Sequence, residues 1–213
     1  MIKLIYGYEL AREAYLADQM FRLRAEVFKG RLNWEVKVSN GWEQDQFDRH
    51  NPLYALSIDT DGELQGALRL LPTTGPHMLR DVFNSLMDDD APIVSPQIWE
   101  STRFCVSPKA AAIRSHNRLN YVTGELLASI VEVGQRAGLS SVISVYDARM
   151  RRILRLAGCE AVEVGTPRKI GNVTTYAGLF PIDTPMLERI RAAAGIEGSV
   201  LDVTPNANAT LAA

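Results

Sequence analysis

The sequence predicts a single α/β domain in which helices cover both faces of a mixed β-sheet. With 213 residues, of which 46% are hydrophobic, the chain is long enough to bury one sizeable core. Short apolar runs alternate with segments of helical period along most of the chain, which favours such a sheet. We expect the domain to span residues 1–198, and we expect the small, polar residues 199–213 to form a flexible tail.

The composition narrows the class of function. A net charge of -2 argues against a general nucleic-acid binder, which would carry a basic surface. Cys105 and Cys159 provide no disulfide framework, and we expect both to be buried apolar residues in a reducing compartment. Residues 1–10 contain no signal sequence or membrane span, so we expect a cytoplasmic protein without membrane insertion. We expect no metal site, because the histidines lack the spacing of ligands and are expected in loops or at the surface: His50, His77 and His116.

The first elements are an apolar strand at Ile2–Tyr6 and a helical period over Glu9–Phe28. Arg24 falls on the apolar stripe of this helix, between Phe21 and Phe28. A buried arginine needs carboxylate partners. Arg24 therefore either faces an acidic cluster from elsewhere in the chain or extends to solvent from the end of the helix.

The stretch Lys29–Asn51 shows no clean period and contains Trp34 and Trp42. A long polar segment with large aromatic residues is expected to be a loop that acts as a lid or binding segment. Its second half carries three closely spaced carboxylates. These could face Arg24 and a second arginine, bind a hard cation, or form a solvated charge run, although a calcium loop would need a glycine and further oxygen ligands. The three carboxylates are those of Glu43, Asp45 and Asp48.

Two apolar runs, Leu53–Asp59 and Glu63–Leu71, predict a β-hairpin across an Asp-Gly turn. Arg69 lies inside the second run, which is another arginine in an apolar setting. Met78–Met87 is expected to be a short helical piece and Asp88–Pro92 a loop. The apolar residues expected to point inward from the helical piece are Leu79, Val82, Phe83 and Leu86.

The central strand is predicted at Trp99–Val106, because β-branched and aromatic residues dominate it and Pro96 stands before it. It also carries Glu100 and Arg103, and buried charges persist only when they are paired. An acid and a base on one buried strand indicate a functional site, unless they form an ion pair at a strand edge without chemistry. The period of two places them on opposite faces, or a β-bulge redirects one of them.

The later part of the chain predicts an amphipathic helix at Arg118–Ala137 and a strand at Leu139–Tyr146. A further helix at Ala148–Ala157 begins after Asp147, a good N-cap, and ends at Gly158. This helix is expected to expose four arginines: Arg149, Arg151, Arg152 and Arg155.

The last strands are predicted at Ala161–Gly165 and Val173–Phe180, with Arg168 and Lys169 in the turn between them. A short helix at Thr184–Ala194 follows.

The charged and aromatic residues form an ordered series of short motifs. They read Arg24-x-x-Val27-Phe28, Trp34, Glu43-x-Asp45-x-x-Asp48, Leu68-Arg69-Leu70-Leu71-Pro72-Thr73 and Trp99-Glu100-x-x-Arg103-Phe104. Each motif is weak alone, but the whole series over residues 24–104 closely resembles the N-acyl-homoserine lactone synthases, the LuxI-type autoinducer synthases of bacterial quorum sensing.

This resemblance implies a fold similar to the GCN5-related N-acetyltransferases (GNAT-like), a three-layer α-β-α sandwich with a mixed, splayed central sheet. A pantetheine thioester would lie where the central strand and the next strand separate. In the implied reaction, the α-amine of S-adenosylmethionine attacks the acyl thioester of an acyl carrier protein, or of coenzyme A in some members. The acylated methionine moiety then lactonises and releases methylthioadenosine. S-adenosylmethionine is a substrate, no cofactor is implied, and a monomer is expected.

The resemblance also implies roles for single residues. Glu100 is the candidate general base, and backbone N–H groups near Phe104 would hold the thioester oxyanion. The residues expected to bind S-adenosylmethionine, with the aromatic pair meeting its sulfonium and adenine, are Arg24, Phe28, Trp34, Asp45 and Arg103. The rest of the charge network would be Glu43, Asp48 and Arg69. The acyl or thioester site would include Thr102, Phe104, Ser144 and Met150, of which Phe104 and Met150 are also natural core residues.

The four arginines after Asp147 are expected to dock an acidic acyl carrier protein, and the alternative is a solvated helix face. Two other functions stay open. An amine acyltransferase of the same fold that uses acyl-coenzyme A would not require the three acids or Trp34. A non-catalytic sensor of S-adenosylmethionine or acyl thioesters would have no use for a base at Glu100.

Overall fold

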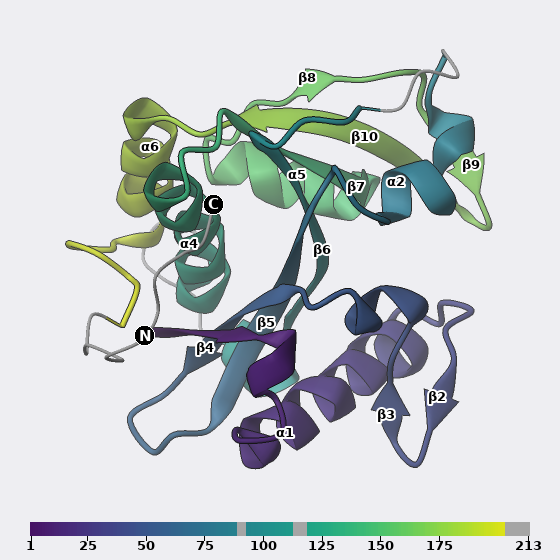
Figure 1. Ribbon diagram of the computed structural model, residues 1–213. Coiled ribbons are helices and arrows are strands. Elements are labelled where there is room, and N and C mark those ends of the chain that lie inside the picture. The colour runs from purple at the N-terminus through teal and green to yellow at the C-terminus, as the bar shows by residue number, and fades with distance from the viewer. Residues whose placement is uncertain (89–92, 113–118, 203–213) are drawn as a thin grey trace.

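The computed structural model describes residues 1–88, 93–112 and 119–202. Within these ranges, an eight-stranded sheet carries helices on both faces (Figure 1). Neighbouring strands pair antiparallel, except that β6 and β7 pair parallel. The strand order is β1 (Ile2–Tyr6), β4 (Leu53–Ile58), β5 (Leu64–Pro72), β6 (Ile98–Val106), β7 (Ser141–Asp147), β10 (Val173–Pro181) and β8 (Val162–Glu163), with β9 (Arg168–Ile170) also on β10.

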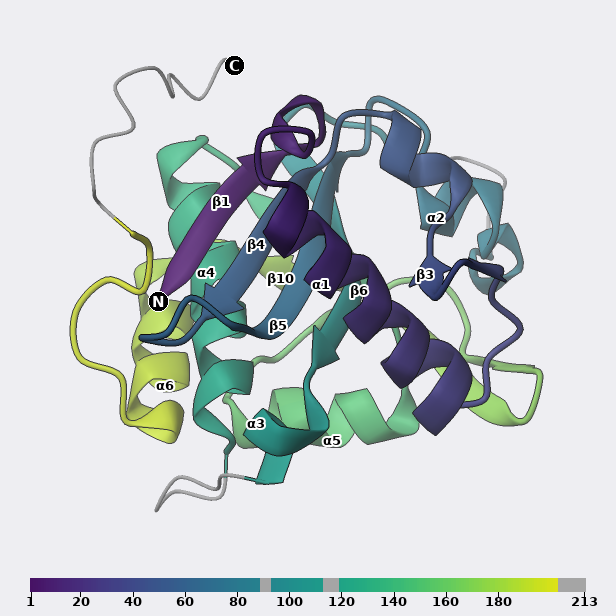
Figure 2. The same cartoon turned by 90° about the horizontal axis from the view of Figure 1, so that it is seen from below.

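Three layers result from the way the helices distribute over the sheet. In Figure 2, α1 crosses in front of β4 and β5 while α4 lies behind them. The helices of the α1 face are α1 (Ala14–Arg24), α2 (Met78–Asp81) and the 3₁₀ turn η4 (Asn84–Leu86). The other face is covered by α4 (Tyr121–Arg136), α5 (Ala148–Leu156) and α6 (Thr184–Ala194), which enclose the largest hydrophobic core. The expected three-layer sandwich is confirmed.

Local sequence signals explain where the helices of the second face begin and end. Leu126 and Val133 are fully buried on the apolar side of α4. Asp147 caps α5 by accepting a hydrogen bond from the Met150 N–H at 2.7 Å, as its position before the helix predicted. Gly158 follows α5 with φ at 72°, in the left-handed region where glycine has no steric cost.

The sheet divides between β6 and β7. Parallel pairing runs from Ile98 opposite Ser141 to Ser101 opposite Ser144, and it stops there. Beyond this point β6 pairs only with β5, and β7 pairs only with β10. The two strands therefore form a fork that opens after Ser101 and Ser144, as the splayed sheet required, and β6 runs between the two halves of the molecule in Figure 1.

A β-bulge lies just inside the fork. The register between β5 and β6 shifts between Ala67 and Arg69, so that β6 holds one extra residue there. Arg103 occupies the bulge with φ at 55°, an uncommon value for a residue with a side chain. The bulge turns the Arg103 side chain toward the carboxylates Glu43 and Asp45. Of the two alternatives that the sequence left open, opposite faces of a regular strand or a bulge, the structure contains the bulge.

The stretch Lys29–Asn51 is not a continuous loop. The chain leaves α1 through a π-helix, then forms a small hairpin and a 3₁₀ turn: η2 (Ala25–Arg31), β2 (Val38–Ser39), β3 (Trp42–Glu43) and η3 (Gln46–Arg49). The Trp42 indole donates to Asp18 on α1 at 2.8 Å, which fastens the hairpin to the helix. Sequence period could not reveal these elements because they are too short to repeat.

Other boundaries also differ from expectation. Val82 is 49% exposed rather than inward-facing, because α2 ends at Asp81. Arg168 and Lys169 lie in β9 rather than in a turn. The expected loop at 88–92 lies, apart from Asp88, outside the described residues, as does the start of the helix expected from Arg118.

The expected tail is partly ordered. Ser199 donates to the buried Glu132, and Leu201 forms a parallel bridge with Ile2 at the edge of the sheet. Val200 and Leu201 are buried in the main core. The packed domain therefore extends at least to Asp202, and residues 203–213 lie outside the described part.

Candidate active site

Three arginines and three carboxylates close a ring of ion pairs on the α1 face of the sheet. Around the ring, the nitrogen–oxygen distances are 2.6 Å for Arg24–Glu43, 3.1 Å for Glu43–Arg103, 2.6 Å for Arg103–Asp45, 2.6 Å for Asp45–Arg69, 2.7 Å for Arg69–Asp48 and 2.9 Å for Asp48–Arg24. Each member has two ring partners of opposite charge. We call these six residues the ion-pair ring.

The ion-pair ring joins four parts of the chain and is largely buried. Arg24 comes from the end of α1, and its side chain is 1% exposed, so it does not extend to solvent. Arg69 on β5 is completely buried. The three acids come from β3 and the turn after it, so they are neither a cation site with free oxygens nor a solvated charge run. Buried charges persist here because every guanidinium faces carboxylates.

Neutral hydroxyls complete the ring's hydrogen bonding. The Tyr54 hydroxyl donates to Asp48 at 2.8 Å, and the Thr102 hydroxyl accepts from the Arg69 Nε at 3.1 Å. Burial alone would raise the pKa of Asp48, but Arg24 and Arg69 together hold that pKa well below its usual range. The pKa of Arg24 is raised by Asp48 and Glu43 in spite of its burial. Arg24 and Asp48 therefore stay charged at neutral pH.

An aromatic pair borders the ion-pair ring. Phe28 and Trp34 stack with ring centroids 5.3 Å apart and planes 10° apart. Phe28 lies within the π-helix η2, and the Trp34 N–H donates to the Phe28 carbonyl at 2.8 Å, which returns the chain onto the Phe28 ring. The Arg103 guanidinium lies 5.5 Å from the centroid of the Phe28 ring. Phe28 is buried and Trp34 is exposed, so the pair forms a wall with one open side.

Asp45 and Arg103 are the ring members nearest to solvent, with 17% and 10% of their side chains exposed. Asp45 also caps η3 by accepting from the Phe47 N–H at 2.9 Å. Its two oxygens meet Arg69 and Arg103, so a substrate amine would share this carboxylate with two guanidinium groups.

Glu100 lies on β6 but outside the ion-pair ring. It is completely buried, and its two oxygens accept from the N–H groups of Met78 and Leu79 at 2.8 and 2.7 Å. Burial raises the pKa of its carboxyl, while these two hydrogen bonds oppose the increase. Among its described contacts neither Arg69 nor Arg103 is a hydrogen-bond partner.

The residues expected at the thioester lie at or near the fork. The Ser144 hydroxyl donates to the Ser101 carbonyl at 2.8 Å, across the last paired position of β6 and β7. Thr102 and Phe104 follow on the part of β6 that has no partner on β7. Phe104 and Met150 are partly buried against the main core, in agreement with core packing.

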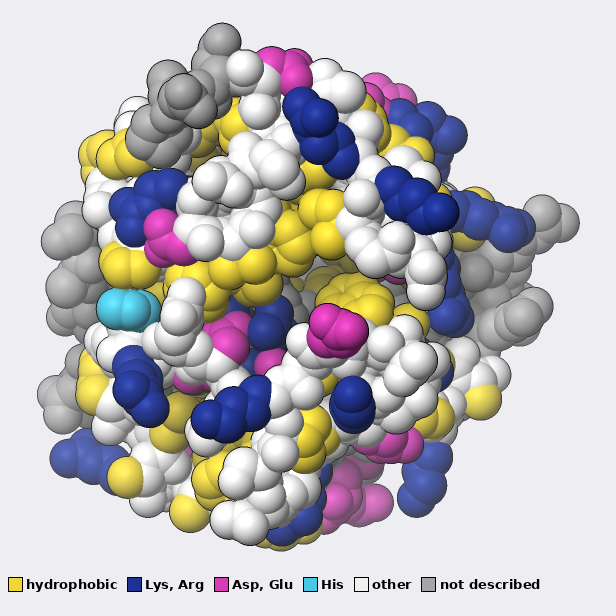
Figure 3. Space-filling view, turned by 90° about the vertical axis from the view of Figure 1, so that its right-hand side faces the viewer, with side chains coloured by type: hydrophobic (Ala, Val, Ile, Leu, Met, Phe, Trp, Pro, Cys, Tyr) yellow, Lys and Arg dark blue, Asp and Glu magenta, His cyan; other side chains and the backbone are white. Residues whose placement is uncertain are grey.

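A hollow on one face exposes this arrangement. Figure 3 shows positive and negative side chains at the floor of the hollow, and a band of hydrophobic side chains along its wall. A separate buried hydrophobic cluster lies beneath the surface beside β7 and β10, with Leu79, Leu86, Ile143 and Ala177 at its centre. The site thus combines a charged region with an apolar one.

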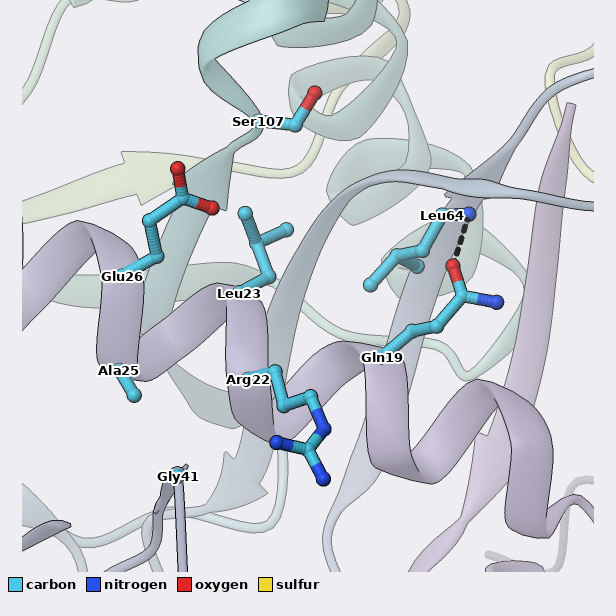
Figure 4. A pocket seen from close by; sticks show the side chains of 8 residues that line it. All are labelled: Gln19, Arg22, Leu23, Ala25, Glu26, Gly41, Leu64 and Ser107. Atoms are coloured by element: carbon cyan, nitrogen blue, oxygen red, sulfur yellow. Dashed lines mark hydrogen bonds between the residues drawn. The ribbon is translucent and has the colours of Figure 1, made fainter.

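A second depression of about 460 Å³ lies beside α1, between the helix and the chain at Leu64 and Ser107. Figure 4 shows its lining residues, among them Gln19, Arg22 and Glu26 of the helix segment and Leu64 of β5. None of the candidate site residues lines this depression, which is open to solvent. We assign no chemistry to it.

The four arginines of α5 are not equivalent. Arg149, Arg152 and Arg155 are exposed, as expected. Arg151 is half-buried instead, because it pairs with Glu163 on β8 and its guanidinium lies 4.4 Å from the ring centroid of Tyr176. Arg151 therefore connects α5 to the sheet, and the other three arginines leave their charge exposed to solvent.

Two cysteines and three histidines complete the residues considered from the sequence. Cys105 and Cys159 are buried, and burial raises the pKa of both thiols to about 12, which confirms their reading as apolar residues. His77 is buried in front of α2 rather than exposed, and its Nδ1 lies 3.0 Å from the Gly75 carbonyl oxygen. His50 is exposed, and His116 lies outside the described residues.

Comparisons with known proteins agree with this geometry. The family model described as "Autoinducer synthase" matches residues 8–190. The chain belongs to the autoinducer synthase family. It is 38% identical over 172 residues to an acyl-homoserine-lactone synthase of Agrobacterium fabrum, covering 81% of this chain and 82% of that protein. Another acyl-homoserine-lactone synthase, from Rhizobium etli, is 36% identical over 186 residues. The match covers 86% of this chain and 84% of that protein.

Solved structures of autoinducer synthases share the fold. The CoA-dependent acyl-homoserine lactone synthase MesI superposes with a TM-score of 0.83 at 27% identity, covering 95% of this chain and 100% of the other. The LasI synthase gives a TM-score of 0.78 at 25% identity, with coverage of 93% and 98%. The protein is thus an acyl-homoserine-lactone synthase with a GNAT-like fold. In its described part, no helix is long and apolar enough to cross a bilayer.

Several residues that shape this autoinducer synthase site have no signal in the sequence. Tyr54 donates to the ion-pair ring from the middle of β4, and its apolar surroundings gave no sign of this. Phe47 lies under the Arg69 guanidinium, 5.6 Å from its ring centroid. The Met78 sulfur lies 3.1 Å from Arg103 Nη1. Phe47 and Met78 are apolar residues whose role depends on a distant arginine, so their own positions could not reveal it.

The segment after α1 is expected to open locally in solution. Trp42 and the ion-pair ring fasten its second half, whereas the anchors of residues 29–37 are the partly buried Leu32 and Val36 and the exposed Trp34 stacked on Phe28. S-adenosylmethionine should therefore slow hydrogen exchange of residues 29–37 by about tenfold or more, and that of residues 42–48 less. Equal protection of residues 29–37 with and without this ligand would refute the expectation. Peptides from β4 serve as the unresponsive control.

Proposed function

We propose that this synthase makes N-acyl-L-homoserine lactones from S-adenosylmethionine and the acyl thioester of an acyl carrier protein. The observation that carries the proposal is the stacked pair Phe28 and Trp34 beside Arg103, next to the fork of the sheet. Aromatic faces attract a sulfonium and stack on an adenine, and a guanidinium suits a carboxylate. The structure of BjaI "with SAM and isopentyl-CoA" contains the same amine substrate beside an acyl thioester, in that protein one of coenzyme A.

The first chemical step is acyl transfer. The α-amine attacks the thioester carbon, the C–N bond forms, the C–S bond breaks and the carrier thiol leaves. The N–H groups of β6 beyond Ser101 face a region without a β7 partner, and N–H donors in that place can stabilise the developing oxyanion. In the second step a carboxylate oxygen of the acylated methionine moiety attacks the γ-carbon of the same moiety, the C–O bond forms, the bond between that carbon and the sulfonium sulfur breaks, and methylthioadenosine leaves.

The amine must lose a proton in the first step. Its reference pKa of about 7.7–8.0 leaves most of it protonated near neutral pH. The sequence predicts Glu100, the carboxylate of the central strand, as the base for this step. The pH dependence of Glu100→Gln tests this prediction against a positioning role.

Two kinds of acyl donor are compatible with the fold. Two related synthases are described as CoA-dependent. We favour an acyl carrier protein for this chain because three exposed arginines on α5 suit a strongly acidic partner. Coenzyme A carries its charge on a small nucleotide and would not need an extended basic helix face.

The test is a reconstituted reaction. The purified protein is incubated with S-adenosylmethionine and either acyl-carrier-protein or acyl-coenzyme A, and products are identified by mass spectrometry. Acyl-homoserine lactone and methylthioadenosine in equal amounts are expected, at a higher rate with the carrier protein. Amide products on another amine would indicate a different acyltransferase. Binding of S-adenosylmethionine without any turnover would indicate a sensor.

The Ser144 hydroxyl is expected to influence the choice of acyl chain. It lies at the opening of the fork, where the first carbons of the chain would pass, and its oxygen can still accept a hydrogen bond. We expect Ser144→Ala to shift the preference between chains substituted and unsubstituted at the third carbon by about three- to tenfold. A donor panel measures this shift. An unaltered preference would remove Ser144 from the specificity site.

A further inference from the structure

Glu100 is connected to the ion-pair ring through α2 rather than directly. Its carboxylate holds the first two N–H groups of that turn, those of Met78 and Leu79. The Met78 side chain then reaches Arg103, with 3.1 Å between sulfur and Nη1. The sequence of contacts from Glu100 to Met78 to Arg103 ends at the guanidinium that lies against Phe28.

The short α2 needs such an anchor. It spans Met78–Asp81, only four residues, and a single turn of helix is not stable by itself. Met78 packs with Phe47 and Leu71 in a small hydrophobic cluster of its own, separate from the main core. Leu71 pairs with Glu100 in the sheet. Glu100 therefore fixes α2 at the place where the apolar cluster and the ion-pair ring meet.

Glu100 is poorly placed for direct proton transfer in this structure. A general base must reach the proton directly or through one water. Glu100 has no exposed surface, and both of its oxygens already accept backbone hydrogen bonds. Arg103, by contrast, is 10% exposed and borders the aromatic wall.

We propose that Glu100 and Met78 are positioning residues: Glu100 fixes α2, and the Met78 thioether on α2 holds the Arg103 guanidinium against Phe28, where S-adenosylmethionine binds. The proposal rests on the proposed function, because it assigns Arg103 and Phe28 to that substrate. It adds Met78 to the site and gives Glu100 a role that does not involve the proton of the amine.

Substitutions of Met78 and Glu100 should weaken the hold on Arg103 to different extents. Met78→Leu keeps the volume but removes the sulfur acceptor, so the KM for S-adenosylmethionine should rise by about three- to tenfold, with little change in kcat. Glu100→Gln directs an amide NH₂ at one of the backbone N–H groups and leaves that donor unpaired. Its kcat/KM for S-adenosylmethionine should fall by about 10- to 100-fold.

Two readouts separate positioning from general-base catalysis. If Glu100 positions α2, the Glu100→Gln deficit should be the same at pH 6.5 and pH 9, whereas loss of a base would matter less above the amine's pKa of about 8. The kcat/KM of the double variant should fall by much less than the product of the two single-variant factors, because both substitutions act through the same contact. A deficit that shrinks at high pH, or losses that multiply, would overturn the proposal.

Controls keep the test decisive. Met87→Leu removes another partly buried sulfur that packs beside β7 and β10 away from Arg103, and it should leave KM unchanged. If Glu100→Gln fails to fold, the comparison of Met78→Leu with Met87→Leu still decides, since equal KM values would refute the role of Met78. The double-variant comparison can also be measured in denaturant unfolding without substrate. Suppose that the two substitutions are non-additive in the free energy of unfolding, while the wild type makes no lactone. The proposed function would then be refuted, but the contact between Glu100, Met78 and Arg103 would be supported.

Discussion

Replacement of Arg24 by methionine is expected to lower the free energy of unfolding by about 3–5 kcal/mol. The Arg24 side chain is 1% exposed and faces Glu43 and Asp48, so its loss leaves two buried carboxylates with fewer partners. Methionine fills much of the volume, and the remaining effect is electrostatic. Denaturant unfolding followed by circular dichroism measures the change.

The matched control is Arg22→Met on the same helix. Arg22 also forms an ion pair, with Asp18 at 2.9 Å, but its side chain is 56% exposed. Exposed pairs contribute about 0–1 kcal/mol, so this variant should unfold almost like the wild type. Similar losses for Arg22→Met and Arg24→Met would show that helix propensity, and not the ion-pair ring, causes the effect.

Reversal of the charge at Arg152 and Arg155 to glutamate is expected to raise the KM for acyl-carrier-protein by about tenfold or more at low salt. Both side chains are exposed on α5, whereas Arg151 is engaged with Glu163 and Tyr176 and is left unchanged. Added salt should reduce the difference from the wild type, because it screens the charges of both proteins. Initial rates at several salt concentrations measure it.

The control for this experiment reverses two exposed arginines elsewhere, Arg12 and Arg136. This variant carries the same change in net charge and should keep the wild-type KM for the carrier protein. The affinity for S-adenosylmethionine should stay unchanged in both variants. An equal rise of KM in both would reveal an effect of net charge, and no rise in either would refute docking on α5.

Much of this architecture was predictable because its elements are long. β5 is a nine-residue run that is almost continuously apolar, and α4 shows its helical period over 16 residues. Asp147 and Gly158 mark both ends of α5. The buried arginines were also informative. A charge inside an apolar run has to find a partner, so the sequence alone could connect Arg24 and Arg69 with the acids of residues 43–48.

The parts that could not be predicted depend on short elements and on irregular backbone. The two-residue strands β2 and β3 leave no period, and η2 differs from an ordinary helix only in its hydrogen bonding. The residue with positive φ in the bulge is Arg103 itself and not a glycine, so the sequence gives no signal for the bulge. The partners of Glu100 are backbone N–H groups, which nearly every residue possesses, so no side-chain pattern could identify them.

The closed form of the ion-pair ring limits how such a site can change through mutation. Each member has two neighbours of opposite charge, so removal of one member always leaves two groups short of a partner and a net charge in the interior. Removal of an adjacent arginine and carboxylate together keeps the interior neutral, and apolar residues of similar volume can then fill the space at a small cost in stability. Single-step substitutions at these six positions therefore pass through a poorly folding intermediate, while paired ones do not. Such a ring should persist or change two residues at a time, whatever acyl chain the synthase carries.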